Sequence, residues 1–380
     1  MDSEFSRPEL HLPDLSISGF RGIENLAIGK LGRVTLLAGR NGVGKSTVLD
    51  AVRVYAGQSD PTILDIVLDE RGEVLQVASA DAHPLDVPDY LALFHRRATA
   101  RCETVSIGSP GLGRLLTLAA CRMSELEVAE RKLLNGDNDP ETLVIKVCFG
   151  DSVTFFPVPI AEGRSLTWNT PGRSRSGRRG VRRSDDSPTP IKCQSLGPDV
   201  PGDYAMLEAW ANVALTADED RAVEALRPIH GDGIERVAFV GGGGARSRGA
   251  RAIVKLRGHP DPVPLRSLGD GATRMFAAAL ALATCRDGFL LIDEAENGIH
   301  HQIQEDYWRL ILLTAAINNV QVLATTHSWD CVGGFARAAA ALDEVEGRLV
   351  RLERRGEQTR AVEYDEDLLE TVADQRIEVR

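Results

Sequence analysis

Three mainly apolar runs stand out in the hydropathy pattern of the chain. They are Val34–Ala38, Phe289–Ile292 and Val320–Thr325. Short runs without polar alternation are typical of strands that are buried on both faces of a parallel sheet. Between the last two runs, Ile303–Ile317 has the periodicity and length of a crossover helix. The pattern therefore predicts an α/β fold built on a mixed, largely parallel sheet flanked by helices.

Other segments alternate apolar and polar residues, as half-buried strands do. Thr142–Phe149 and Ser152–Phe156 flank Gly150-Asp151, and this turn signal predicts a hairpin. Further strands are predicted at Leu15–Phe20, Ile234–Val240, Arg251–Leu256, Leu349–Glu353 and Ala361–Tyr364. Helical periodicity predicts helices over Ile63–Arg71, Leu85–His95, Gly113–Leu134, Ala272–Cys285 and Asp367–Ala373.

These elements predict a division of the 380 residues into one head and one insertion. We expect 1–58 and 234–380 to form the two parts of the head, and 59–233 to form a helical, α+β insertion. Within the insertion, 164–183 contains seven arginines among Gly, Ser and Pro and almost no apolar residues. Such a segment cannot pack a core, so we expect a mobile loop.

The net charge of −11 excludes a general electrostatic attraction to nucleic acid or to an anionic membrane. Contact with DNA would need a local patch, and the arginine-rich loop is the candidate. Its residues at 173–183 could neutralise several phosphates if they were ordered together: Arg173, Arg175, Arg178, Arg179, Arg182 and Arg183. The alternative is a solvated loop without a partner, because Asp185 and Asp186 follow at once.

The six cysteines have no CxxC spacing, which argues against a zinc ribbon and against a disulfide framework. No apolar run reaches the roughly 18 residues that a membrane span requires. We therefore expect a cytoplasmic protein that is neither exported nor inserted in a membrane.

The first apolar run leads directly into a glycine-rich turn that fits the phosphate-binding pattern GxxxxGK[ST]. Its glycines leave backbone N–H groups free, and the helix that follows points its positive end at an anion. Lys45 is expected to reach the β- and γ-phosphates, and the Ser46 hydroxyl to coordinate Mg²⁺. A chance glycine-rich turn is the alternative, but the flanking strand and helix oppose it. The candidate nucleotide-binding residues are Gly39, Arg40, Asn41, Gly42, Val43, Gly44, Lys45, Ser46 and Thr47.

The second apolar run ends in two carboxylates, Asp293 and Glu294, and is read as a Walker B motif. Ligands of open α/β sheets bind at the carboxyl ends of the strands. Asp293 is expected to hold Mg²⁺, and Glu294 to orient and polarise an attacking water. Taken alone, an Asp-Glu pair could equally cap a helix. The sequence contains no Asn-Lys-x-Asp guanine-reading motif, so ATP is preferred to GTP.

A second polar, glycine-rich turn, Leu265–Gly271, opens the alanine-rich helix that precedes the Walker B run. A turn that meets a helix N-terminus is another anion site. The two phosphate-facing turns come from distant parts of the chain. A single γ-phosphate does not need both of these turns from the same subunit. We therefore expect a dimer that sandwiches ATP.

At this turn the chain resembles the ATP-binding-cassette (ABC) branch of ATPases, with Ser267-Leu268-Gly269-Asp270-Gly271 in place of the LSGGQ-type signature. The resemblance implies that Ser267, Gly269 and Gly271 contact nucleotide held by the partner's phosphate loop. His327, in Ala324-Thr325-Thr326-His327-Ser328, follows a strand as the switch histidine of that group does, which implies a hydrogen bond to the γ-phosphate. On its own, such a histidine is more often a structural residue. A Q-loop glutamine is not evident; Gln58 and Gln76 are the candidates.

The run Asp293-Glu294-Ala295-Glu296-Asn297-Gly298-Ile299-His300 resembles soluble AAA family ATPases of the SMC, RecF and OLD-nuclease group. Phe20-Arg21-Gly22 and the segment after Thr325 are similar to the same group, so the resemblance covers about 12–58 and 234–380. His300 and His301 could be imagined as metal ligands, but a solvated helix start is the preferred interpretation.

The resemblance implies ATP hydrolysis with ATP and Mg²⁺ as ligands, in a DNA-related or anti-phage role. OLD-type proteins carry a Toprim nuclease domain, but only about fifty residues follow His327, so none is expected here. A separately encoded effector, such as a Toprim-like nuclease, is the implied partner. The alternative is an ATP-dependent dimerisation switch or DNA-binding scaffold with little turnover.

Overall fold

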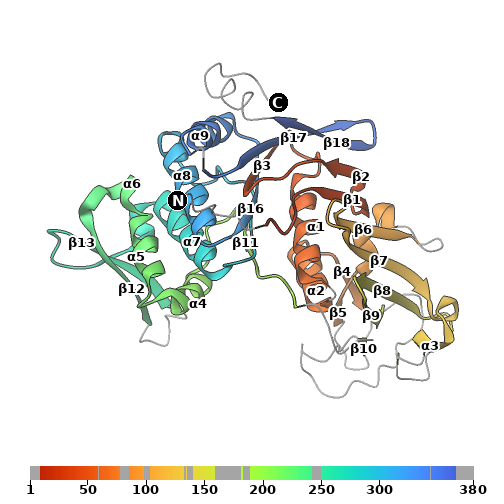
Figure 1. Ribbon diagram of the computed structural model, residues 1–380. Coiled ribbons are helices and arrows are strands. Elements are labelled where there is room, and N and C mark those ends of the chain that lie inside the picture. The colour runs from red at the N-terminus through yellow and green to blue at the C-terminus, as the bar shows by residue number, and fades with distance from the viewer. Residues whose placement is uncertain are drawn as a thin grey trace, which may run out of the picture.

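The computed structural model describes residues 9–58, 60–77, 85–97, 103–131, 134, 140–158, 181–182, 189–241, 250–342 and 344–364 (Figure 1). Among these residues no helix is both long enough and apolar enough to cross a membrane. The arginine-rich loop, apart from Val181 and Arg182, and the predicted helix Asp367–Ala373 lie outside the described residues.

A six-stranded, largely parallel sheet carries the three apolar runs. Its order is β11 (Cys193–Leu196), β15 (Phe289–Ile292), β16 (Gln321–Thr326), β3 (Val34–Ala38), β17 (Gly347–Arg355) and β18 (Gln358–Tyr364). All pairs are parallel except the terminal hairpin β17–β18. Every residue of β3, β15 and β16 is buried, which confirms the prediction from their continuous hydrophobicity.

A second sheet is antiparallel and has seven strands. Its order is β10 (Val181–Arg182), β9 (Ser152–Pro157), β8 (Leu143–Phe149), β7 (Arg114–Arg122), β6 (Thr104–Ser109), β1 (Leu15–Phe20) and β2 (Ile23–Ile28). The hairpin predicted at Gly150-Asp151 is confirmed as β8–β9. Because β6 pairs with β1, the strands that follow the phosphate loop extend a sheet begun by the N-terminal hairpin.

Helix α1 (Lys45–Gly57) lies between the two sheets (Figure 1). Its buried side chains, such as Val48 and Val52, share one core with Ile17 of β1, Ile107 of β6 and Leu291 of β15. The helix therefore begins at the edge of the parallel sheet and is held on both sides.

The helices predicted over Leu85–His95 and Gly113–Leu134 are wrong. The first segment is strand β5 (Leu85–Pro88), paired with β4 (Val74–Val77) and followed by the short 3₁₀ helices η1 (Tyr90–Leu93) and η2 (His95–Arg97). Pro88 has no N–H to donate inside a helix. The second segment is β7, followed by η3 (Met123–Glu125) and the short α3 (Val128–Arg131).

The helix predicted at Ile63–Arg71 is confirmed as α2 (Pro61–Glu70). Its first turn is capped by Asp60, whose carboxylate accepts from the Thr62 N–H at 2.9 Å.

The other face of the parallel sheet is covered by α7 (Asp270–Thr284), α8 (Gln304–Ile317) and α9 (Trp329–Ala340) (Figure 1). Outside α7 lie α4 (Asp203–Val213), α5 (Ala217–Glu224), α6 (Arg227–His230), the short η4 (Gly231–Gly233) and a small sheet of β12 (Ile234–Gly241), β13 (Ala250–Leu256) and β14 (Val263–Pro264). Trp210 of α4 packs its ring against Phe239 of β12 and Phe276 of α7. This contact ties the outer layer to the helix that follows the signature-like turn.

The boundaries at residues 58 and 233 stay a prediction. β11 lies within 59–233 but pairs in parallel with β15, so one strand of the predicted insertion is part of the main sheet.

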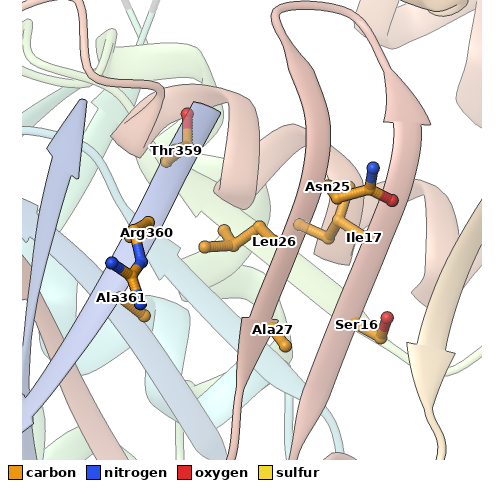
Figure 2. Close-up of a pocket in the computed structure, with 8 residues that line it drawn as sticks. All are labelled: Ser16, Ile17, Asn25, Leu26, Ala27, Thr359, Arg360 and Ala361. Atoms are coloured by element: carbon orange, nitrogen blue, oxygen red, sulfur yellow. The ribbon is translucent and has the colours of Figure 1, made fainter. Parts of the chain in front are cut away.

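The free edges of the two sheets face each other at β2 and β18. Figure 2 shows a cavity of about 430 Å³ between them, with Leu26 of β2 pointing toward β18. Gly29 donates its N–H to the Glu363 carboxylate across this junction, at 2.6 Å. Thr359, which lines the cavity, donates to the Val43 carbonyl at 3.4 Å, so the cavity borders the phosphate loop.

Candidate functional site

The phosphate loop joins the end of β3 to the start of α1, as predicted. Gly39, Gly42 and Gly44 have φ values of 145°, 77° and 101°, which L side chains rarely adopt. A Cβ at Gly39 would also lie 2.6 Å from the Leu352 carbonyl oxygen of β17. The loop therefore requires glycine for its backbone conformation and, at Gly39, for space.

Lys45 is buried within this loop. Its Nζ donates to the carbonyls of Gly39, at 2.7 Å, and Arg40, at 3.0 Å. Burial lowers the pKa of Lys45, while the carboxylates of Glu296, Asp293 and Glu294 act in the opposite direction. The ammonium thus holds the loop closed and faces the acidic residues that follow β15.

Ser46 and Asp293, predicted to share a metal, are in contact. The Ser46 hydroxyl donates to Asp293 Oδ1 at 3.0 Å, and the Thr325 hydroxyl donates to the same oxygen at 2.6 Å. The register of the sheet explains the contact with Thr325, because Ile292 of β15 is paired with Ala324 of β16.

A hydroxyl and a carboxylate are the oxygen ligands that Mg²⁺ takes in proteins, so the residues present fit this ion. Among the described residues no cluster of three or more His, Cys, Asp or Glu could hold a metal. A magnesium ion at Ser46 and Asp293 would therefore depend on phosphate oxygens and water for its remaining ligands.

Glu294 stands just past Asp293 with φ of 50°, an uncommon backbone conformation for a residue other than glycine. Its N–H donates to the Thr325 hydroxyl at 2.9 Å. Its Oε2 accepts from the Asn297 side-chain amide at 2.7 Å. The carboxylate is thus oriented by a residue of the same turn rather than left free.

His327 lies one residue beyond β16. Because Thr326 is paired with Ala38, His327 lies beside the start of the phosphate loop. Its backbone N–H and its Nδ1 both contact Oε1 of Glu296, at 2.8 and 2.9 Å. Glu296 had no role in the sequence analysis beyond its place in the acidic run.

The signature-like turn is 3₁₀ helix η5 (Leu265–Leu268) followed by Gly269, with φ of 96°, and by the first turn of α7. Ser267 and Gly269 are exposed. A Cβ at Gly271 would lie 3.1 Å from the Gly298 carbonyl, so this turn packs against the segment after Glu294. Within the described residues, no hydrogen bond joins Ser267, Gly269 or Gly271 to residues 39–47 of the same chain.

Arg274 of α7 is a residue that the sequence reasoning missed. It is 1 % exposed, and its guanidinium donates to the carbonyls of Gly197 (3.0 Å) and Pro198 (2.8 Å) after β11. It also donates to the carbonyls of Asp293 (3.1 Å) and Glu294 (3.0 Å). One buried cation therefore connects the signature helix to the turns after β11 and β15. An arginine in an otherwise apolar helix face is the sequence signal that could have identified it.

A polar cavity of about 150 Å³ lies beside Asp293, between α1, α2 and the end of β11. Asp50 lines it and pairs with Arg71 at 3.0 Å and with Arg21 at 3.6 Å. Burial raises the pKa of Asp50, and the hydrogen bond and charge of Arg71, with the charge of Arg21, act against this. The lining residues are Leu49, Asp50, Arg53, Glu70, Arg71, Ser195, Gly197, Pro198, Leu291 and Asp293.

The Q-loop candidates do not line this cavity. Gln58 caps the C-terminal end of α1, and Gln76 lies on β4. His300 and His301 are exposed at the start of η6 (His301–Ile303), which agrees with a solvated helix start.

Comparison with known proteins gives two family matches. Residues 221–330 match the family described as "AAA domain, putative AbiEii toxin, Type IV TA system". Residues 10–62 match a family described as a protein of unknown function, DUF2813. The first match contains the signature-like turn and the Walker B run, and the second contains the phosphate loop.

Similar proteins include the uncharacterized protein MJECL11 of Methanocaldococcus jannaschii, which is 34 % identical over 90 residues, 24 % of this chain and 78 % of that protein. Similar solved structures include an SmcHead bound to the C-winged helix domain of ScpA (13 % identity, TM-score 0.48, covering 94 % of this chain and 99 % of that one). Others are the SMC head domain from Thermotoga maritima (12 %, 0.40, 94 % and 100 %) and the Smc head domain with an extended coiled coil bound to the C-terminal domain of ScpA, derived from Pyrococcus furiosus (11 %, 0.48, 97 % and 100 %).

The AAA-domain match and the meeting of Ser46, Asp293 and Thr325 at one edge of the parallel sheet agree with each other. The chain belongs to the same family as MJECL11, and it combines a region that matches the AAA-domain family with a phosphate loop at the edge of a parallel sheet.

Proposed function

We propose that this chain binds ATP with Mg²⁺ at the carboxyl ends of β3, β15 and β16, closes as a dimer around it and hydrolyses it. The observation that carries the proposal is the contact of Ser46 with Asp293, beside Glu294 and His327. These groups come from three strands that are not adjacent in sequence. Their convergence supports a built site for a triphosphate and its metal.

The phosphate loop supplies backbone N–H groups and Lys45 to the anion. Lys45 would leave the carbonyls of Gly39 and Arg40, since phosphate oxygens are the stronger acceptors. Ser46 and Asp293 would hold the magnesium ion, which neutralises charge on the β- and γ-phosphates when bound. Gly39 to Thr47 thus provide binding, and Asp293 fixes the metal.

Glu294 is proposed to orient the attacking water and accept its proton. Asn297 supports this role, because its amide fixes the Glu294 carboxylate while leaving Oε1 available. Arg274 supports it as well by holding the carbonyls of Asp293 and Glu294.

The signature-like turn is proposed to complete the site of a second copy. Ser267, Gly269 and Gly271 lie at the N-terminal end of α7, and the exposed part of this turn makes no hydrogen bond to the phosphate loop of its own chain among the described residues. A helix N-terminus with free N–H groups is suited to an anion held by a partner.

The output is proposed to be a separately encoded effector, in anti-phage defence or a DNA-related role. The matched family is described by a putative toxin of a toxin–antitoxin system, and this supports a defence role. A Toprim-like nuclease as effector, contact of DNA with the loop at 173–183 and a cytoplasmic location remain part of the proposal.

The test is a comparison of wild type with Glu294→Gln, in assays of phosphate release and of mass in solution. Hydrolysis should fall by on the order of 100-fold or more. ATP binding should persist, and a dimer should accumulate with ATP and Mg²⁺. A wild type that binds ATP and dimerises but releases phosphate no faster than Glu294→Gln would instead identify a dimerisation switch with little turnover.

A further inference from the structure

Glu296 is a nearly buried carboxyl group between the phosphate loop and His327, and the proposed mechanism assigns it no step. It is 9 % exposed on its side chain, and its Oε1 accepts two hydrogen bonds from one residue, His327. Its Oε2 is buried and has no hydrogen-bond partner among the described residues. A buried carboxylate with so few donors requires a compensating positive charge.

The turn that carries Glu296 is fixed in place. The Ala295 N–H donates to the Thr325 carbonyl at 2.9 Å, and the Glu294 N–H donates to the Thr325 hydroxyl. The His327 N–H holds Glu296 Oε1 from the other side at 2.8 Å. The carboxylate and the imidazole ring therefore meet in one geometry.

This geometry decides which nitrogen of His327 carries hydrogen. An ionised carboxylate has only acceptor oxygens, so Nδ1 at 2.9 Å must be the donor. A neutral imidazole has one N–H, and its Nε2 is then an acceptor. The ring is 45 % exposed, beside the start of the phosphate loop.

An acceptor at Nε2 repels the oxygens of a γ-phosphate, which are acceptors too. A proton taken from solvent removes the conflict: the imidazolium donates through Nδ1 to Glu296 and through Nε2 to the phosphate. No covalent bond of the nucleotide changes in this step. We propose that Glu296 is a positioning residue that fixes the tautomer of His327, so that recognition of a γ-phosphate by His327 requires uptake of one proton.

Other charged groups near the pair do not replace this proton. They come from the turn after β15, from α1, from α7 and from α9: Asp293, Glu294, Lys45, Arg274 and Asp330. Lys45 contacts the loop carbonyls and would turn to the phosphates when nucleotide binds, so it does not supply a hydrogen to His327 Nε2. Arg274 is held by backbone carbonyls. Burial raises the pKa of Tyr307 and of Cys331 to about 12, so both stay neutral near pH 7.

This inference rests on the proposed ATP binding. Its test is calorimetric titration of wild type with a non-hydrolysable ATP analogue and with ADP, both with Mg²⁺, from about pH 6 to about pH 8. Two buffers of different ionisation enthalpy count the protons taken up. The analogue's affinity should fall by up to about tenfold per pH unit as the pH rises across this range, with proton uptake. ADP should show neither effect, which controls for titration of the shared phosphates.

The decisive variant is Glu296→Met, which keeps much of the side-chain volume but has no carboxylate oxygen to accept from Nδ1. The neutral ring can then carry its hydrogen on Nε2, so the analogue should bind without proton uptake and with an affinity as flat with pH as that of ADP. His327→Ala should lose the preference for the analogue at every pH. Glu305→Met, on an exposed ion pair of α8, is the matched control and should behave as wild type.

Thermal melting of each variant confirms that it is folded. Equal pH slopes in wild type and Glu296→Met would overturn the role of Glu296, and so would a wild type that binds the analogue with no proton uptake. A wild type that binds no nucleotide at all would overturn the proposed ATP binding as well, so the two failures are distinguishable.

Discussion

At the scale of single residues, Asp293 is the point where the phosphate loop meets the rest of the site. Its Oδ1 accepts hydroxyl hydrogens from Ser46 and Thr325, and its carbonyl accepts from Arg274. The Asp293 side chain is therefore the proposed metal ligand, while its backbone carbonyl is held by Arg274. Substitutions at Asp293 and at Arg274 separate the two roles.

Asp293→Asn keeps an oxygen that can accept from Ser46 and Thr325 but removes the negative charge. We expect the affinity for the ATP analogue in Mg²⁺ to fall by on the order of 10- to 100-fold, because the metal loses its charged ligand. Affinity without Mg²⁺ should change little, since Lys45 and the loop amides remain. Calorimetry with Mg²⁺ and with chelator measures both. Asp306→Asn, on exposed α8, is the control, and a loss that is equal with and without Mg²⁺ would contradict the assignment.

Arg274→Met keeps much of the side-chain volume but leaves four or more carbonyls without their donor. Unsatisfied buried groups cost roughly 1–3 kcal/mol each, so we expect the free energy of unfolding in urea to drop by about 3 kcal/mol or more. Arg274→Lys, with three donors on one nitrogen, should recover part of this loss.

The same variants report on catalysis. Because Arg274 holds the Glu294 carbonyl and not the nucleotide, kcat should fall in Arg274→Lys while KM for ATP changes little. Arg309→Met, an exposed arginine on α8, is the matched control for stability. A rise in KM with unchanged kcat would show that the residue acts on binding instead.

At the scale of elements, β7 shows where local pattern and tertiary structure diverge. Arg114–Arg122 contains leucines at 115, 116 and 118, which fit both a helical and an alternating pattern. Pairing with β6 on one side and β8 on the other selects the strand. Leu116 and Leu118 then face the core, and Leu115 faces solvent.

A strand and a helix at β7 predict different stability costs for leucine-to-alanine substitutions. Leu116→Ala and Leu118→Ala should each lower the free energy of unfolding by about 2–5 kcal/mol, because both side chains are fully buried. Leu115→Ala, 39 % exposed, should cost about 0.5 kcal/mol or less. Urea denaturation measures all three. A comparable cost at Leu115 and Leu118 would favour a helix, in which positions three apart share a face.

The elements that sequence could predict are those whose signal is local. β3, β15 and β16 are mainly apolar and buried throughout, and the glycines, Lys45 and Ser46 follow one of them directly. β11 has four residues of mixed polarity, and only its pairing with β15 makes it part of the sheet. Thr325, Glu296 and Arg274 contact residues 19 or more positions away in sequence, so no local pattern could reveal their contacts.

At the scale of the whole molecule, the phosphate loop and the signature-like turn lie on different layers. The loop begins α1, between the two sheets, whereas the turn begins α7, which packs with α4 and the β12–β14 sheet (Figure 1). The turn contacts Gly298 of its own chain through Gly271, while Ser267 is exposed. A second copy that approached this exposed turn could place its own phosphate loop there, which is the arrangement that the proposed dimer requires.

Complementation between two inactive variants tests this arrangement directly. Lys45→Ala removes the phosphate contact, and Ser267→Arg blocks the exposed signature turn, so neither homodimer should hydrolyse ATP. In a mixed dimer, one composite site combines the intact Lys45 of one subunit with the intact Ser267 of the other. Each mixed dimer has one intact site of two, so between about a quarter of wild-type activity, if all pairings form equally, and about half, if only mixed dimers form, should return. Phosphate release from an equimolar mixture measures it, and unmixed Lys45→Ala should also fail to dimerise with ATP. If the mixture stayed as inactive as its components while both variants remained folded, each subunit would hydrolyse ATP with its own residues alone, and the shared site would be wrong.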